Sequence, residues 1–240
     1  MDTPQDERQL KRVTRRQLLT LTPLVVLGAF AVPKLRRPLL MGGQNFSDWA
    51  SAQLFRARHP ATTFSDSDLT PLGRFPYNSY DVDDPEIDLE SWTLTVSGLV
   101  KKPDAYTLAQ IQALPKAAQN TRHVCVEGWD VIGNFAGARL VDFLALVGAD
   151  LHARFLTFAC ADDYYESLDM PSAVHPQSLL CYEMYGRPLL PGHGAPLRLS
   201  LPTKLGYKSA KYLTQLTVTN ELGDRRGYWV DQDYSWFAGL

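Results

Sequence analysis

The chain has 240 residues, of which 45% are hydrophobic and 21% are charged, and its formal net charge is −2. These values are ordinary for a globular protein and exclude a disordered, collagen-like or disulfide-dense chain. The near-neutral charge gives no indication of nucleic-acid binding. The three cysteines cannot all pair with one another, so at least one thiol is left for burial, chemistry or metal binding: Cys125, Cys160 and Cys181.

The amino-terminal segment, residues 1–37, is rich in Lys and Arg, whereas the rest of the chain is acidic. Arg15 and Arg16 precede an uncharged stretch from Gln17 to Pro33, which is shorter than the roughly 20 residues that span a bilayer. This arrangement resembles a twin-arginine export signal. Basic residues follow the stretch closely, so a retained membrane anchor is the alternative to a cleaved signal. We therefore expect the protein to be periplasmic, or anchored in the membrane and facing the periplasm.

Residues 38–74 are rich in Pro, Gly, Ser and Asp, and we expect them to form a connector with one short helix around residues 46–58. Apolar and polar residues alternate over residues 92–97, which is the period of a half-buried strand. Residues 107–114 are predicted to form a short helix, because Thr107 can cap its amino-terminal end.

Four apolar residues at the spacing i, i+3, i+4 and i+7 predict one buried face of a helix that Gly148 ends: Leu140, Phe143, Leu144 and Val147. Further strands are predicted at residues 155–159, 197–201 and 216–218. Strands and short helices are therefore interspersed with many loops. This pattern predicts a single α+β domain, which we place at residues 75–240.

The segment 121–144 reads TRHVCVEGWDVIGNFAGARLVDFL and contains the lone cysteine Cys125 shortly before a Trp. It resembles the cofactor-binding core of the sulfite oxidase superfamily, in which such a cysteine ligates molybdenum. Residues 92–103 look like the opening strand and turn of that family. Residues 181–213, with HGAPLR and GYKSAK, look like its pterin-binding half. The resemblance covers about residues 75–240 and implies a sulfite oxidase-type molybdopterin-binding fold with mixed sheets, short helices and many loops.

The chemistry of sulfur suits Cys125 for this role. A thiolate is a soft donor, and a metal binds the deprotonated thiol. Val124 and Val126 indicate a strand that ends at Glu127 and Gly128, which places the sulfur near a strand end. From the residues alone, a small buried structural cysteine is the alternative. The resemblance implies that Cys125 is the protein ligand of one molybdenum-molybdopterin per chain.

The pterin cofactor ends in a phosphate, which needs cations and backbone donors around it. Arg198 alternates with leucines in a predicted strand and can bind phosphate with two hydrogen bonds. Lys204 is expected on the surface, where most lysines lie. The resemblance implies that five residues of this half contact the cofactor: His193, Arg198, Lys208, Ser209 and Lys211.

Two further residues are matched to the cofactor site by the resemblance. Asn78 lies where the reductase branch of the superfamily has a cofactor-contacting Asn, although an ordinary turn fits these residues equally well. Cys160 lies where that branch has a Thr near the metal. The alternatives for Cys160 are an inert strand cysteine and a disulfide with Cys181 after export.

The branch of the superfamily is indicated by Asp130. Sulfite oxidases have an Arg at this position that attracts sulfite, whereas an anion there would repel an anionic substrate. We also expect no carboxy-terminal dimerisation domain and no haem-binding CxxCH motif. These features resemble the periplasmic methionine-sulfoxide reductase molybdoproteins.

The sequence therefore predicts an exported molybdenum-pterin oxidoreductase that transfers an oxygen atom, reducing a sulfoxide or a similar oxide. A sulfite-type dehydrogenase and a cofactor-binding module without turnover are alternatives, as is a thiol enzyme that uses Cys125 with His123. The expected partners are a small-molecule or protein-bound oxide substrate and a membrane or periplasmic electron donor, either a quinol oxidoreductase or a cytochrome. No nucleic-acid partner is expected.

Overall fold

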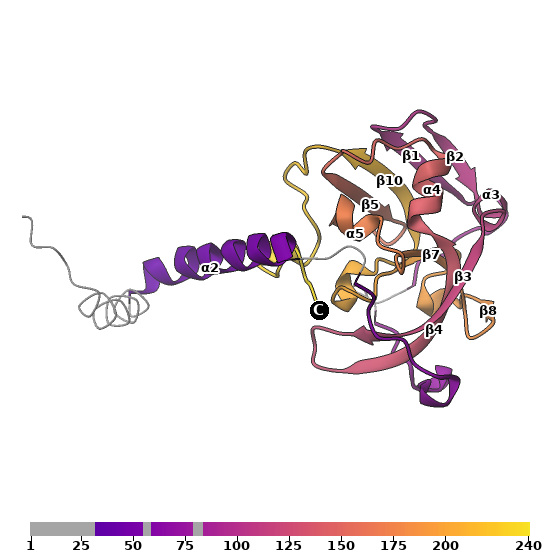
Figure 1. Ribbon diagram of the computed structural model, residues 1–240, viewed down its shortest axis with the longest axis horizontal. Coiled ribbons are helices and arrows are strands. Elements are labelled where there is room, and N and C mark those ends of the chain that lie inside the picture. Colours follow the sequence, from indigo (N-terminus) through magenta and orange to yellow (C-terminus); the bar gives the residue numbers. More distant parts are fainter. Residues whose placement is uncertain (1–31, 55–58, 79–83) are drawn as a thin grey trace, which may run out of the picture. The chain divides into compact units, whose positions relative to one another are not determined.

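The computed structural model describes residues 32–54, 59–78 and 84–240 (Figure 1). The contacts divide the chain into two units, residues 1–47 and residues 48–240. Arg15 and Arg16 of the predicted export signal lie outside the described residues. Helix α2 (Pro33–Leu54) begins earlier than the helix predicted around residues 46–58. Within the described ranges, no helix combines the length and the apolar character needed to cross a membrane.

The first sheet of the second unit has the strand order β2-β1-β10-β5-β6. Its strands are β1 (Thr93–Gly98), β2 (Asp104–Thr107), β5 (Phe155–Cys160), β6 (Tyr165–Asp169) and β10 (Leu213–Thr219). Strands β1 and β10 are parallel, and the other neighbours are antiparallel. The predicted strands in residues 92–97, 155–159 and 216–218 are confirmed. The parallel pair brings the carboxy-terminal part of the domain beside its first strand.

The second sheet has the order β3-β4-β7-β8, and β9 pairs with β7. Its strands are β3 (Lys116–Val124), β4 (Asp130–Arg139), β7 (Leu179–Met184), β8 (Arg187–Pro188) and β9 (Arg198–Ser200). Strands β3 and β4 form a long hairpin whose register runs from Lys116 opposite Ala138 to Val124 opposite Asp130. Cys125 therefore lies near a strand end, as predicted, but β3 ends at Val124, before the predicted end at Glu127 and Gly128.

The helices of the second unit are short. They are α3 (Leu108–Gln112), α4 (Leu140–Leu146) and α5 (Met170–Ala173), with single turns at Asp66–Asp68, Leu72–Arg74, Pro191–His193, Gly206–Lys208 and Val230–Gln232. The predicted cap of α3 is confirmed, because the Thr107 side chain accepts a hydrogen bond from the Gln110 N–H at 3.3 Å. The predicted α4 face is confirmed too, because all four of its apolar residues are fully buried.

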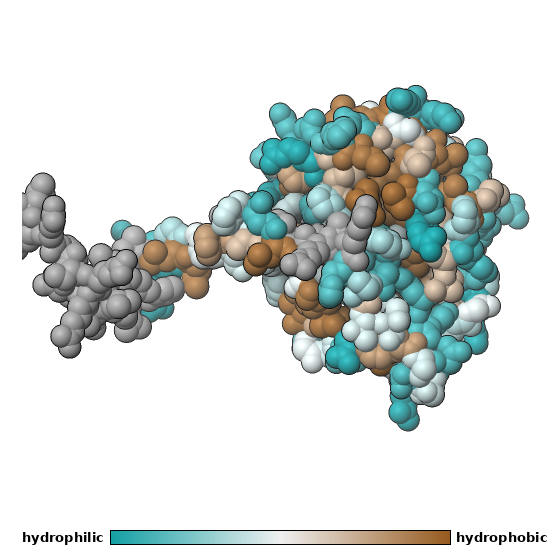
Figure 2. Space-filling view, viewed as in Figure 1, coloured by the Kyte–Doolittle hydropathy of each residue, from teal (hydrophilic) through white to brown (hydrophobic). Residues whose placement is uncertain are grey.

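The main hydrophobic core lies between the two sheets and α4. Leu94, Leu156 and Leu216 of the first sheet pack in one cluster with Leu180 and Leu199 of the second. Fully burying one such leucine contributes on the order of 2 kcal/mol. Hydrophilic residues cover much of the visible face of this unit in Figure 2, with smaller hydrophobic areas between them. The architecture confirms the predicted α+β class with mixed sheets and short helices.

Two lysines lie inside the domain instead of on its surface. The Lys208 ammonium is 2.6 Å from Glu166 Oε1, and both side chains are 1% exposed. The Lys204 ammonium is 3.5 Å from Asp169 Oδ1 and donates to the Phe237 carbonyl at 2.8 Å. The prediction that Lys204 is exposed is therefore wrong. A buried charge is tolerated where a carboxylate and backbone oxygens replace the lost water, which a single sequence does not reveal.

We predict that Lys208→Ala lowers the free energy of unfolding by about 3–5 kcal/mol, because it leaves Glu166 buried without its partner. Urea unfolding followed by circular dichroism measures the change. The matched control is Lys116→Ala, since the pair between Lys116 and Glu183 is partly exposed, with side chains 53% and 24% accessible. We expect little change in the control. Equal losses in the two variants would contradict the role given to the buried pair.

Candidate functional site

A cavity of about 200 Å³ lies in the second unit. Its wall comes from segments far apart in the sequence: residues 75–78, the loop after β3, residues 162–164, 192–198 and 206–211, and the carboxy-terminal residues Trp229 and Tyr234. A wider hollow of about 1040 Å³, bordered by Phe64, Arg122 and Leu240 among others, contains no predicted site residue. The smaller cavity is therefore the candidate site.

Six of the eight predicted site residues line this cavity: Asn78, Cys125, His193, Arg198, Ser209 and Lys211. Two of them do not. Cys160 is buried at the end of β5, and the Lys208 side chain is directed toward Glu166. All three cysteines are free, so Cys160 and Cys181 form no disulfide. Tertiary folding thus collects these six residues from four separate parts of the sequence around one space.

Cys125 lies in the loop that closes the β3–β4 hairpin. Its N–H donates to the Trp129 carbonyl at 2.9 Å, which fixes the backbone of the loop. The Glu127 carboxylate accepts hydrogen bonds from Asn78 Nδ2 at 2.9 Å and from Trp129 Nε1 at 3.0 Å. Asn78 Nδ2 and Glu127 Oε2 are each 3.7 Å from Cys125 Sγ. The thiol is therefore flanked by an amide donor and a carboxylate.

The surroundings of Cys125 keep its thiol protonated when no cation is near. Burial raises the pKa of Cys125, and the Glu127 carboxylate raises it further. The pKa of Glu127 is itself lowered, first by the hydrogen bond from Trp129 and then by that from Asn78. A bound metal cation would reverse this balance, because it stabilises the thiolate. The site therefore suits a metal ligand better than a free nucleophile.

His123 does not supply the base that a thiol enzyme needs. Its ring packs against Phe75 and Trp129, with centroids 5.7 and 6.1 Å apart. Burial lowers the pKa of His123 to about 3, with Arg198 and His193 adding to the effect. In the described part of the chain, His123 and Cys125 form no hydrogen bond. An imidazolium–thiolate pair is therefore disfavoured.

Arg198 places a cation inside the domain beside the cavity. It lies on β9, is 4% exposed, and its guanidinium donates to the carbonyls of Leu199 at 3.2 Å, His193 at 3.0 Å and Ser209 at 3.2 Å. No carboxylate among the described residues pairs with it. A buried cation whose hydrogen bonds go only to carbonyls favours an anion at the remaining N–H donors of its guanidinium.

Lys211 adds a second cation to the same wall. Its ammonium donates to the Gly192 carbonyl at 2.9 Å, and within the described ranges it forms no ion pair. Burial, and then the nearby Arg198, lower the pKa of Lys211 to about 8, while the carboxylates of Asp84 and Asp162 act in the opposite direction. Gly194 allows the close approach of these segments, because its φ is +98° and a Cβ there would lie 2.8 Å from Lys211 Cβ. The two cations leave this wall electropositive.

His193 presents an unsatisfied polar atom. Its Nε2 is buried and has no hydrogen-bond partner among the described residues. The ring stacks on Tyr77 with centroids 4.5 Å apart and meets Phe75 edge-on at 5.1 Å. Burial lowers the pKa of His193 to about 4, so the ring is neutral at pH 7. Buried polar atoms normally have partners, so Nε2 indicates a polar ligand in the cavity.

Sequence reasoning missed several residues of this site. Glu127 is one of them, and its position two residues after Cys125 was the sequence feature that could have identified it. Asp130, which was expected to set the charge of the site, instead lies on the surface and pairs with Arg122 at 3.3 Å. Aromatic residues from distant segments also line the cavity, and no local pattern identified them: Tyr164, Tyr207, Trp229 and Tyr234. The anion beside the thiol is therefore Glu127.

Residues 81–229 match the family described as oxidoreductase molybdopterin binding domain. The YedZ1 protein of Azospira oryzae, whose name assigns it to a protein-methionine-sulfoxide reductase, is 45% identical over 202 residues, which cover 83% of this chain and 76% of that protein. Arabidopsis thaliana sulfite oxidase is 32% identical over 220 residues, covering 76% of this chain and 55% of that enzyme. The protein-methionine-sulfoxide reductase catalytic subunit MsrP of Xanthomonas campestris is 27% identical over 197 residues, covering 72% and 61%.

Among solved structures, the sulfane dehydrogenase SoxCD of Paracoccus pantotrophus is similar, with a TM-score of 0.57 and 19% identity, covering 71% of this chain and 52% of that one. This likeness concerns the fold alone. The chain spans only 52–61% of the length of SoxCD, the plant sulfite oxidase and MsrP. The family match over residues 81–229 and the identity with the Azospira protein show that this chain is an enzyme of the molybdopterin-binding oxidoreductase family, on the methionine-sulfoxide reductase-like branch of the sulfite oxidase superfamily.

Proposed function

We propose that this protein binds one molybdenum-molybdopterin per chain and reduces a sulfoxide or a similar neutral oxide. One observation carries the proposal: a single cavity holds the Cys125 thiol together with two cations, Arg198 and Lys211, that form no ion pair with a carboxylate of the described residues. This combination fits a cofactor that has both a thiophilic metal and a phosphate. When bound, such a cofactor supplies two-electron oxygen-atom transfer.

The residues of this chain hold and orient the reacting groups. Cys125 is the proposed metal ligand, and its loop is kept in place by the hydrogen bond to the Trp129 carbonyl. Asn78 and Glu127 flank the sulfur and are hydrogen-bonded to each other, so they are positioned to orient an oxide next to it. Arg198, Lys211, Ser209 and the unpaired His193 Nε2 are the proposed contacts for the pterin and its phosphate. Cys160 and Lys208 do not line the cavity, so they are not included in the proposed contacts.

The charge beside the thiol supports a neutral substrate. The Glu127 carboxylate has a lowered pKa and is ionised at pH 7. An anion such as sulfite would meet this carboxylate next to Cys125, which would oppose its binding. The sulfite-type dehydrogenase alternative has the likeness to sulfite oxidase in its favour. The names of YedZ1 and MsrP, in contrast, refer to methionine sulfoxide. Turnover of any oxide would exclude a module that only binds the cofactor.

We further propose that the protein works outside the cytoplasm, exported by the twin-arginine route, with electrons from a membrane or periplasmic partner. Arg15 and Arg16 before the apolar stretch support the route. Two of the relatives are named as subunits, which supports a partner protein here. Reduction of an oxide consumes two electrons and two protons per water formed, so an electron donor is required.

The first prediction from the proposed function concerns the metal ligand. We expect Cys125→Ser to reduce the molybdenum content and the sulfoxide reductase activity at least about tenfold, because a hydroxyl is a harder and less ionised donor than a thiol. Metal analysis and the oxidation of a reduced dye by a sulfoxide measure both quantities. Cys160→Ala is the matched control, and it should retain metal, because Cys160 lies outside the cavity. Full metal-dependent activity in Cys125→Ser would refute the assignment.

The second prediction concerns the anion site of the cofactor-free protein, probed with sulfate, whose charge is constant near neutral pH. The pKa of Lys211 in the empty protein is about 8, and a bound anion raises it. Sulfate affinity should therefore be highest below pH 8 and should fall as the pH rises above it. Isothermal titration calorimetry across this range measures the effect.

Two variants separate the contributions to the anion site. Lys211→Met should weaken sulfate binding below pH 8 and remove the pH dependence. Arg198→Ala should weaken binding at every pH, because a guanidinium stays protonated throughout. A flat pH profile in the unmodified protein, or an unchanged profile in Lys211→Met, would show that anions bind elsewhere.

The third prediction concerns export. Arg15→Lys combined with Arg16→Lys should leave the folded protein in the cytoplasm, because the signal is read by a receptor and charge alone does not replace it. Lys11→Gln, which removes a nearby charge but keeps the pair, should be exported normally. Cell fractionation with cofactor analysis distinguishes the two. Normal export of the double variant would exclude the twin-arginine route.

A further inference from the structure

The carboxy-terminal segment, residues 227–240, folds back onto the domain. The Tyr228 N–H donates to the Tyr165 carbonyl at 2.9 Å, and the Leu205 N–H donates to the Ala238 carbonyl at 2.8 Å. The buried Lys204 ammonium holds the Phe237 carbonyl at 2.8 Å. The family match ends at residue 229, so most of this segment lies beyond it. The segment is therefore a fixed part of the structure that the family assignment does not explain.

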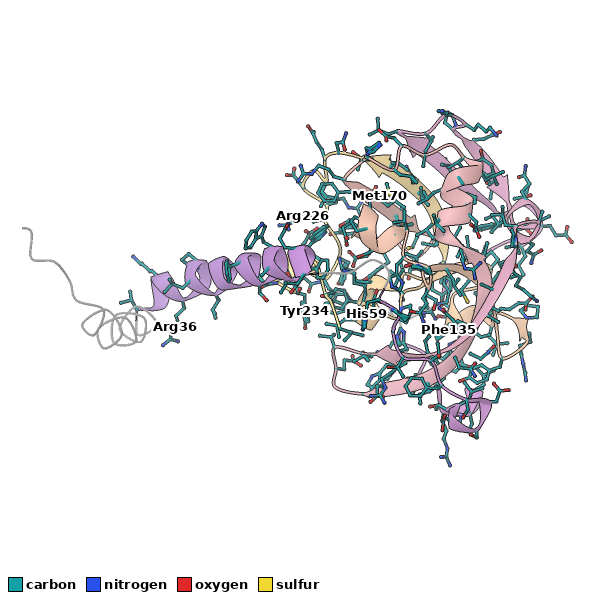
Figure 3. The ribbon with its side chains drawn as sticks, viewed as in Figure 1. Arg36, His59, Phe135, Met170, Arg226 and Tyr234 are labelled. Carbon is teal, nitrogen blue, oxygen red and sulfur yellow. The ribbon has the colours of Figure 1, made fainter. Side chains whose placement is uncertain are left out.

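This segment contributes two aromatic side chains to the cavity, Trp229 and Tyr234. Their rings meet with centroids 5.3 Å apart, and the Tyr234 N–H donates to the Trp229 carbonyl at 3.1 Å. Tyr234 is 37% exposed and lies at the periphery of the domain in Figure 3. The ring of Tyr207, which also lines the cavity, meets that of Tyr234 at 6.1 Å. Trp229, Tyr234 and Tyr207 thus form a continuous aromatic wall.

The aromatic wall adjoins the loop that carries Cys125. Tyr207 follows Gly206, and a Cβ on Gly206 would lie 3.1 Å from the Val124 carbonyl oxygen and 2.7 Å from His123 Nε2. The Tyr207 hydroxyl donates to the Ser235 carbonyl at 2.5 Å, which ties the carboxy-terminal segment to this point. The wall is therefore held against the end of β3, directly before the thiol.

We propose that Trp229 and Tyr234 select the substrate by contacting the apolar substituents of a sulfoxide. The inference rests on the proposed function and adds that the preferred substrates carry an apolar or aromatic group on sulfur. Aromatic faces bind alkyl, aryl and sulfur groups favourably, and such contacts are sensitive to removal of the ring. Glu127 and Asp162 are the carboxylates that line the same cavity, so the selection disfavours anionic substrates.

The test compares two oxides of different apolar area on the cofactor-loaded enzyme: dimethyl sulfoxide and methyl p-tolyl sulfoxide. Tyr234→Ala and Trp229→Ala should each raise the KM for methyl p-tolyl sulfoxide about tenfold, which corresponds to about 1.4 kcal/mol, with kcat changed less than about twofold. The kcat/KM for dimethyl sulfoxide should change less than about twofold. Tyr234→Phe, which keeps the ring, should behave as the unmodified enzyme.

Tyr165→Ala is the matched control. Tyr165 touches the same aromatic array through Tyr228, at 6.3 Å between centroids, but does not line the cavity. Molybdenum content and the thermal unfolding midpoint are measured for every variant. If kcat/KM fell equally for both oxides, or if Tyr165→Ala changed the KM as much as the two test variants do, the aromatic wall would have only a structural role. Either result would overturn the inference. Turnover of neither oxide by the unmodified enzyme would instead overturn the proposed function, and the inference with it.

Discussion

The burial of the Arg198 guanidinium is the constraint on which the site depends. Three of its five N–H donors bind the carbonyls of Leu199, His193 and Ser209, which belong to three consecutive parts of residues 181–213. Leaving these donors without partners would be costly, so the three segments are fixed relative to one another. The same arrangement leaves His193 Nε2 and the Lys211 ammonium at the cavity wall. The Arg198 guanidinium therefore fixes the segments around it and also provides a place where an anion can bind.

Neighbouring cations in this half serve different purposes. Lys204 and Lys208 are neutralised by Asp169 and Glu166, and they attach residues 204–208 to β6 and its end. Arg198 and Lys211 lack such carboxylates in the described part of the chain and lie at the cavity. Because a paired charge contributes little field beyond its partner, the positive charge in the cavity wall comes from the second group.

The surroundings of the Cys125 thiol differ from those of the two cations. A tight loop after β3 presents Cys125, and Glu127 is held next to it by Asn78 and Trp129. The carboxylate raises the pKa of the free thiol and discourages anions, so it favours a cationic metal and a neutral substrate. The carboxy-terminal segment adds Trp229 and Tyr234 to the wall of the same cavity. Charge selection and apolar selection therefore come from separate parts of the chain.

The sequence alone determined features that depend on near neighbours. The apolar period of α4, the Thr107 cap, the alternation in β1 and the position of Cys125 at a strand end are all local patterns, and each is found in the structure. The motifs also identified six of the residues that meet at the cavity, because each motif is a short local pattern in the chain.

Only the tertiary structure decided the partners of the charges and the composition of the cavity wall. Lys208 meets Glu166 across 42 positions of the chain, and Lys204 is buried by a segment more than 30 residues downstream. Trp229 and Tyr234 reach the site because the carboxy-terminal segment folds back beside β6. A local pattern reports how a residue suits its own helix or strand. Whether a charge is buried, and which atom offsets that cost, depends on contacts between residues that the sequence places far apart.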